Sequence, residues 1–274
     1  MPDKVNRTFV IAECCSSWRF GDDHLANAFR MIELAKECDA SAAKFQWTSD
    51  PALMAQRRHG EREEFDILAY PFEWLEKLKS KCDEVGIEFM VTCFIAKDIP
   101  TIAPLVKRFK VASAESGDFE FVKANAVFGK PVIASFAFGA NPPTAFFDLT
   151  SLHCVCSYPT PIDQLNLNRI GGQFDGLSDH TTSVLSGAVA VGAGASIVEK
   201  HVRLMSVNED ITPVNPKYVT KGTPPDNPDY GHSLNELQFA VYVRNIREAE
   251  AMMGTGESVM QECEKVNEGR RVKA

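Results

Sequence analysis

The chain has 274 residues, of which 45% are hydrophobic and 24% are charged, and this composition is typical of globular proteins. The formal net charge of −8 argues against nucleic acid as the main partner, because phosphate neutralisation requires a basic surface. No run reaches the roughly 18–20 apolar residues of a membrane span, and residues 1–7 lack the apolar core of a signal peptide. We therefore expect a cytoplasmic protein without a membrane partner, in which most of the eight cysteines are buried thiols.

The first half of the chain alternates short apolar runs with helical patterns. The apolar runs predict strands at 8–13, 41–46, 87–92 and 109–113. Apolar residues at helical spacing predict helices at 24–38, 71–84, 97–108 and 119–128. The long charged segment 47–70 indicates a functional loop or a partly helical excursion.

The second half continues the alternation with less helix. Further strands are predicted at 131–135, 149–156, 175–181 and 195–201, and helices at 183–194 and 234–253. Gly139, Pro142 and Pro143 leave little room for a helix in 136–148, and 162–170 allows at most a short one. Residues 205–230 are rich in Pro, Asn and Asp and predict a loop.

Eight buried strands that alternate with helices predict a (β/α)₈ TIM barrel, with shortened helices after strands 5 and 6. A doubly wound open sheet is the structural alternative, but no glycine-rich phosphate turn follows the first strand. We expect one catalytic barrel domain over 1–257 and a polar C-terminal tail over 258–274.

Polar residues end the predicted strands, and a barrel brings all these ends to one mouth. His180 and His201 end two strands that one helix connects, so both imidazoles are expected at the same edge and could converge on one metal ion. The alternative is a pair of hydrogen-bonded histidines without metal. Lys44 and Lys110 lie on apolar strands, where an unpaired ammonium is costly. They either bind an anionic substrate or pair with carboxylates such as that of Glu13.

Several motifs carry a family likeness. They are IAE at 11–13, AAKFQ at 42–46, FKVAS at 109–113, GKPVIAS at 129–135, LHCVCSYPTP at 152–161, GLSDHT at 176–181 and IVEKH at 197–201. With these motifs, the chain from about residue 9 to 254 resembles the sialic acid synthase family, which comprises N-acetylneuraminate synthase and its legionaminic and pseudaminic relatives. The resemblance implies a metal-dependent condensation of phosphoenolpyruvate with an N-acylated amino sugar such as N-acetylmannosamine. The products are a sialic-acid-type nonulosonic acid and phosphate.

The resemblance also implies roles for individual residues. Glu13 is the expected acid or base, and Glu199 is expected to act beside the metal. The metal ligands are His180 and His201, and Mn²⁺ is the expected ion, with Mg²⁺, Co²⁺, Fe²⁺ and Zn²⁺ as alternatives. The residues expected to bind phosphoenolpyruvate are Lys44, Thr92, Lys110, Ser113, Ser135 and Ser178. Those expected to contact the amino sugar are Gln46, Glu115, Tyr158 and Asp229.

Two kinds of polar side chain near the predicted site are not expected to belong to it. Cys14 or Cys15 could add a thiolate to the metal, as in related keto-sugar acid synthases, but neither is included in the expected ligand set. Asp179 lies between two inward positions of its strand, so its side chain is expected to point away from the mouth.

The chain departs from the family at several positions. Ser17–Gly21 replaces the family's Asn-His-Asn-Gly, Phe136–Phe138 follows Ser135 in place of Thr-Gly-Met, and Cys156 replaces an Asn. These positions bear on the choice of sugar. The family forms homodimers with a C-terminal antifreeze-like domain; we expect a homodimer here, but no such domain. The alternatives are another metal-dependent phosphoenolpyruvate or pyruvate aldol-type enzyme, and a non-catalytic ligand-binding barrel.

Overall fold

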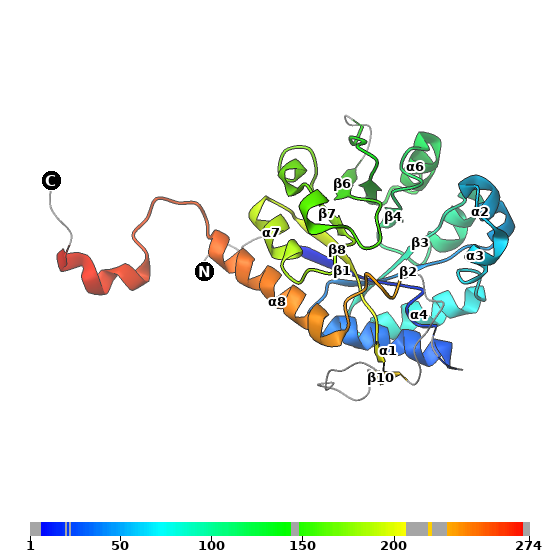
Figure 1. The fold of residues 1–274 in the computed structure, drawn as a ribbon, viewed down its shortest axis with the longest axis horizontal. Coiled ribbons are helices and arrows are strands. Elements are labelled where there is room, and N and C mark those ends of the chain that lie inside the picture. The colour runs from blue at the N-terminus through cyan, green and yellow to red at the C-terminus, as the bar shows by residue number, and fades with distance from the viewer. Residues whose placement is uncertain are drawn as a thin grey trace.

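Eight parallel strands close into a barrel in the computed structural model, with β8 paired to β1 (Figure 1). The structure describes residues 7–19, 21, 23–143, 148–206, 219–220 and 229–270. The strands are β1 (Phe9–Cys15), β2 (Ala42–Gln46), β3 (Glu88–Thr92), β4 (Phe109–Val111), β5 (Val132–Phe136), β6 (Leu149–Cys154), β7 (Gly176–Asp179) and β8 (Ile197–His201). Each predicted barrel strand is present, and the predicted TIM barrel is confirmed.

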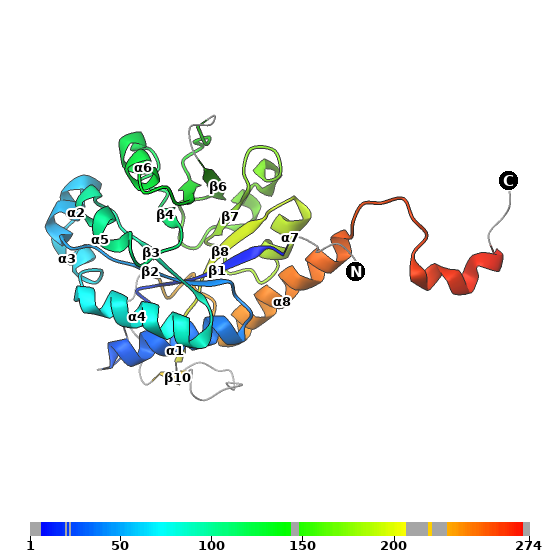
Figure 2. The same cartoon turned by 180° about the vertical axis from the view of Figure 1, so that it is seen from behind.

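Helices surround this barrel on most sides (Figure 2). They are α1 (His24–Glu37), α2 (Pro51–Arg58), α3 (Arg62–Asp66), α4 (Phe72–Val85), α5 (Ile99–Ile102), α6 (Phe119–Ala126), α7 (Ser186–Gly192) and α8 (Glu236–Met253). The described residues between β5 and β6 form no helix, and only the 3₁₀ turns Ile162–Gln164 and Leu167–Arg169 follow β6. The shortened helices after strands 5 and 6 are therefore confirmed.

The barrel interior is built in layers, because side chains along a strand alternate between its two faces. One inward layer is apolar and fills the barrel; it comprises Ile11, Ala42, Met90, Ile133, Leu152 and Ile197. Two residues further along their strands, the inward side chains are polar; they include Glu13, Lys44, Thr92, Ser135, Ser178 and Glu199. Lys110 joins them from β4, where it pairs in register with Thr92. The period of two thus places the polar side chains together above a closed apolar floor.

Two helices on the outside pack unusually closely. A Cβ atom on Gly187 of α7 would lie 2.6 Å from Cζ of Tyr242 on α8, so a larger residue would collide with the ring. The helix α8 begins with a capping box, in which the Asn235 side chain accepts from Gln238 N and the Gln238 side chain accepts from Asn235 N. Just before this start, Leu234 N donates to the His201 carbonyl and Arg203 N donates to the Leu234 carbonyl, and these bonds join the last helix to the end of β8.

Three predictions need correction or completion. The helix predicted over 97–108 is shorter, because Pro104 cannot donate a backbone hydrogen bond and α5 ends before it. The segment 47–70 contains α2 and α3, so the partly helical alternative is the correct one of the two predicted for it. The predicted loop 205–230 contains two short parallel strands, β9 (Met205–Ser206) and β10 (Val219–Thr220); the rest of it up to residue 228 lies outside the described residues.

Residues 254–267 are exposed and lead away from the barrel, and a 3₁₀ helix (Glu262–Arg270) begins within this segment (Figure 1). The predicted polar tail, 258–274, begins here too, and its last four residues lie outside the described residues. Within the described ranges, no helix combines the length and the apolar character needed to cross a membrane.

Candidate active site

A cavity of about 370 Å³ opens at the carboxyl ends of the barrel strands. Twelve of the fourteen predicted site residues line it: Glu13, Lys44, Gln46, Lys110, Ser113, Ser135, Tyr158, Ser178, His180, Glu199, His201 and Asp229. The other two lie one contact behind the wall. Thr92 accepts a hydrogen bond from Lys44, and Glu115 pairs with Arg58, which itself lines the cavity.

Lys44 occupies the centre of the polar layer. Its ammonium pairs with the Glu13 carboxylate, lies 3.6 Å from Glu199 Oε2, and donates to Thr92 Oγ1 at 3.1 Å. Burial alone would lower the pKa of Lys44, but the Glu13 and Glu199 carboxylates outweigh burial and raise it. The pairing with Glu13 that the sequence left open is thus present, and Lys44 is held as a cation at the cavity floor.

Lys110 lies beside this pair and contacts the same second carboxylate. Its ammonium is 3.5 Å from Glu199 Oε1 and donates to Ser135 Oγ at 2.8 Å. Ser178 Oγ also donates to Glu199 Oε1, at 3.0 Å. Burial lowers the pKa of Lys110, whereas the two lysines together lower the pKa of Glu199 despite its burial. We expected Glu199 beside a metal; the contacts of its carboxylate described here are with two cations and a hydroxyl.

Glu13 differs from Glu199 although both are buried. Burial raises the pKa of the Glu13 carboxyl to about 7, and Lys44 offsets only part of this effect. Its Oε1 accepts a hydrogen bond from Cys15 N at 2.7 Å, which fixes the carboxyl group against the end of β1. A carboxyl group with this pKa can take up and release a proton near neutral pH, as general acid–base catalysis requires.

Arg58 of α2 reaches the outer part of the cavity from outside the barrel strands. Its guanidinium binds Glu115 with two hydrogen bonds, of 2.8 and 2.7 Å, and lies 5.0 Å from the ring centre of Phe94. Burial raises the pKa of Glu115, and Arg58 partly offsets this effect. No sequence signal predicts a role for Arg58, because α2 interrupts the barrel pattern and no motif marks this residue.

Three histidines meet on the other side of the cavity. The ring centres of His180 and His201 are 5.3 Å apart, and that of His232 lies 4.4 Å from His201. Tyr158 packs against this group, with its ring centre 4.3 Å from that of His180. The structure thus brings the two predicted histidines together and adds a third. His232 follows Asp229 by three residues, and that D-x-x-H spacing is the signal that could have identified it.

The histidines are held as neutral imidazoles. Burial lowers the pKa of all three, most strongly for His201, and lowers that of His232 to about 4. His180 Nδ1 lies 3.0 Å from the Val155 carbonyl oxygen, which can only accept, so Nδ1 carries the proton and Nε2 keeps its lone pair. Neutral imidazole is the form that binds metal ions.

Asp229 completes this side of the cavity. Its Oδ2 accepts hydrogen bonds from Ser16 N, at 3.2 Å, and from Ser16 Oγ. Its Oδ1 lies 3.8 Å from His201 Nδ1 and 3.6 Å from His232 Nε2. Neither distance is a hydrogen bond, and both nitrogens are buried without a hydrogen-bond partner in the part of the chain that the structure describes.

Asp179 points away from the cavity, as the strand alternation predicted. Its carboxylate lies 3.1 Å from Lys200 Nζ, and both side chains are fully buried. It also accepts from Thr181 N at 2.8 Å, Ser186 Oγ at 2.5 Å and Tyr242 OH at 3.0 Å. This outer network fixes the ends of β7 and β8, on which His180 and His201 lie.

Comparisons with known proteins show the family of this chain. A model of the NeuB family matches residues 31–258. The uncharacterized protein MJ1065 of Methanocaldococcus jannaschii is 30% identical over 98% of this chain and 79% of its own length. Pseudaminic acid synthase of Campylobacter jejuni is 27% identical over 93% of this chain and 78% of its own length.

Among solved structures, the N-acetylneuraminic acid (sialic acid) synthetase of Leptospira borgpetersenii, in complex with citrate, superposes with a TM-score of 0.74. It is 24% identical and covers 97% of this chain and 92% of its own, so the likeness supports the fold. The family model spans most of the chain, including seven of the eight barrel strands and the residues of the cavity from Lys44 to His232. The chain therefore belongs to the NeuB family, the sialic acid synthases.

Proposed function

We propose that this protein condenses phosphoenolpyruvate with the open-chain aldehyde of an N-acylated amino sugar, giving a sialic-acid-type nonulosonic acid and phosphate. The observation that carries the proposal is the pair of buried lysines, Lys44 and Lys110, at the mouth of a barrel of this family. The name of the Campylobacter jejuni relative, pseudaminic acid synthase, supports the same reaction class.

The lysines would bind the anionic groups of phosphoenolpyruvate. Charge-assisted hydrogen bonds from ammonium groups suit phosphate and carboxylate, and the hydroxyls of Thr92, Ser135 and Ser178 lie beside them. When Glu13 and Glu199 are both ionised, their two negative charges balance the two positive charges of the lysines. Protonation of Glu13 leaves a net positive charge that can receive an anion.

Glu13 would then handle the proton of the water that adds to the cationic carbon formed after C–C bond formation. Its carboxyl group lies at the cavity floor beside Lys44, and its raised pKa of about 7 suits proton transfer near neutral pH. Glu199, with its lowered pKa, would keep its charge and hold both lysines in place.

A divalent cation is part of the proposal, and the residues present fit one. His201 Nδ1 and His232 Nε2 are buried and unpartnered within the described residues, and they face the Asp229 carboxylate. His180, the other predicted ligand, directs its lone pair through Nε2. When bound, such an ion supplies Lewis-acid polarisation of the aldehyde oxygen.

The outer cavity would select the sugar. Gln46, Tyr158 and Arg58 line it and offer amide, hydroxyl and guanidinium donors to a polyhydroxylated amide. Cys156 also lines this part, where the family has an amide side chain. We therefore propose an N-acylated hexosamine as the substrate class and leave its stereochemistry to the assay.

The test measures phosphate release and product mass with phosphoenolpyruvate, a divalent metal and a panel of N-acylated hexosamines. We expect release only with such sugars. Lys110→Met should raise the KM for phosphoenolpyruvate about 10- to 100-fold, since a hydrogen bond to a charged group contributes about 1.5–3 kcal/mol. Lys107→Met, which changes an exposed lysine nearby, is the control and should leave this KM unchanged.

Two outcomes would contradict the proposal. Phosphate release with aldehydes that carry no amide would indicate another phosphoenolpyruvate aldol-type enzyme. Binding of phosphoenolpyruvate without turnover of any aldehyde would indicate a non-catalytic barrel.

A further inference from the structure

One cluster on the cavity wall combines a thiol, an imidazole and a carboxylate, whereas the metal ligands predicted from the sequence were two histidines. One possible ligand atom from each of Cys15, His201 and Asp229 lies within 4.8 Å of the other two, and all three residues are buried. They come from the end of β1, the end of β8 and the segment before α8, which are far apart in the sequence. His180 is not part of this group.

The cluster contains a buried imidazole nitrogen that forms no hydrogen bond with the described residues. His201 is 6% exposed, and its Nδ1 has no hydrogen-bond partner among the described side chains and backbone. It faces Asp229 Oδ1 across 3.8 Å, which is too long for a hydrogen bond. Because Ser16 binds the other carboxylate oxygen, the Asp229 side chain is held in this orientation. A buried nitrogen and a buried carboxylate oxygen thus face the same small space.

Cys15 brings a sulfur atom to that space. It lines the cavity, whereas Cys14 belongs to the apolar core outside the barrel. The thiol hydrogen-bonds to the Asp229 carboxylate, so the sulfur and a carboxylate oxygen are already in contact. A coordinating thiol is deprotonated, so a bound cation would take the place of this proton.

We propose that Cys15, His201 and Asp229 together hold the divalent cation, as a thiolate, an imidazole and a carboxylate. This assignment rests on the proposed function only for the use of a divalent cation in this cavity. A thiolate ligand favours Zn²⁺, Fe²⁺ or Co²⁺ over the Mn²⁺ that imidazole and oxygen ligands alone would suit. His232 lies beside the cluster, 3.6 Å from Asp229 Oδ1, and is the nearest further imidazole on this side.

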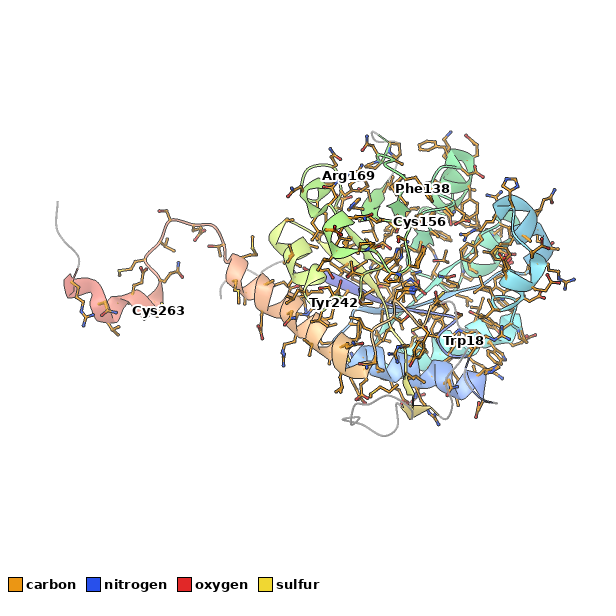
Figure 3. The ribbon with its side chains drawn as sticks, in the orientation of Figure 1. Trp18, Phe138, Cys156, Arg169, Tyr242 and Cys263 are labelled. Atoms are coloured by element: carbon orange, nitrogen blue, oxygen red, sulfur yellow. The ribbon has the colours of Figure 1, made fainter. Side chains whose placement is uncertain are left out.

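The test uses the full chain after metal removal, loaded with Co²⁺ or Zn²⁺ alone, so it requires no turnover. We expect one equivalent of Co²⁺ to give the near-ultraviolet charge-transfer absorption of a thiolate–cobalt bond. Cys15→Ser should abolish this absorption and weaken Zn²⁺ binding by at least about 100-fold, since even an outer-shell partner contributes about 10–100-fold. Cys14→Ser and Cys156→Ser should retain both properties. Cys263 lies on the C-terminal segment away from the barrel (Figure 3).

X-ray absorption of the zinc-loaded protein tests the same assignment without a variant. We expect one sulfur neighbour at about 2.3 Å. A zinc environment of nitrogen and oxygen alone, or an unchanged cobalt absorption in a folded Cys15→Ser protein, would overturn the assignment. Turnover in that case would leave the proposed function standing. A sulfur-ligated metal in a protein that never releases phosphate would instead support the metal assignment and refute the proposed function.

Discussion

Replacement of Asp179 by asparagine tests how the outer wall of the barrel holds the strands that carry His180 and His201. The Asp179 carboxylate is the only negative partner described for the Lys200 ammonium, at 3.1 Å, and neither side chain is exposed to water. It also accepts the hydroxyl proton of Tyr242 from α8. The variant keeps the size of the side chain and removes its charge.

The structure implies a large effect. Removing one charge of a buried ion pair costs about 3–5 kcal/mol, because the remaining charge is left without a partner or water. Burial already lowers the pKa of Lys200, and the other contacts of its ammonium, with the Thr181 carbonyl and hydroxyl oxygens and the Tyr242 ring, carry no negative charge. For a chain of this size, 1 kcal/mol corresponds to roughly 2–4 °C, so Tm should fall by on the order of 10 °C.

The assay is urea unfolding followed by circular dichroism, applied to Asp179→Asn, Lys200→Met and the double variant. We expect the double variant to be more stable than the sum of the two single effects by about 2–3 kcal/mol, the upper range for residues in direct contact. Asp83→Asn, which breaks an exposed pair with Lys79, is the control and should change stability by less than about 0.5 kcal/mol. Additive single effects, or a loss below about 1 kcal/mol for Asp179→Asn, would refute the reasoning.

Two further predictions concern a helix contact and the sugar side of the cavity. Gly187→Ala should cost about 1–3 kcal/mol in the same unfolding assay because its Cβ would overlap the tyrosine ring of α8, whereas Gly192→Ala in the same helix meets no atom within 4 Å and should not destabilise. A neutral result for Gly187→Ala would mean that the two helices can separate. Arg58→Met, which leaves Glu115 without its cation, should raise the KM for the amino sugar about tenfold and leave that for phosphoenolpyruvate unchanged, as expected if one charged contact is lost. Arg57→Met on the same helix is the control, and equal effects of the two variants would contradict a role in sugar binding.

The part of the site that lies on strands could be predicted because its signal is local. Lys44 is a charged residue inside the apolar run AAKFQ, and the period of two places it on the same face as Ala42 and Gln46. The same alternation predicted that Asp179 would face outward. In each case the residue and its neighbours in sequence contain the information, and the barrel adds only the closure of the sheet.

The rest of the site depends on contacts between distant segments. Arg58 lies on a helix outside the barrel repeat, and nothing in its neighbours indicates that it reaches Glu115. Cys15 follows Glu13 by two residues, so the alternation of β1 places its sulfur on the cavity face and that of Cys14 on the outer face. The sequence does not show, however, that Asp229 would lie beside this sulfur, because the two residues are far apart in the chain.

The motifs SDHT and EKH are more specific to this family than any of their single residues. The reason is that each motif contains residues of both strand faces, and each face has its own contacts. Ser178 and His180 line the cavity, while Asp179 between them joins the outer network. On the next strand, Glu199 and His201 line the cavity, and Lys200 between them forms the ion pair with Asp179. A change of register by one residue would turn the cavity-lining side chains of both strands into the outer wall and turn the ion pair toward the cavity. Stability and chemistry therefore require the same register, which explains why a short sequence pattern specifies a site assembled from both strands.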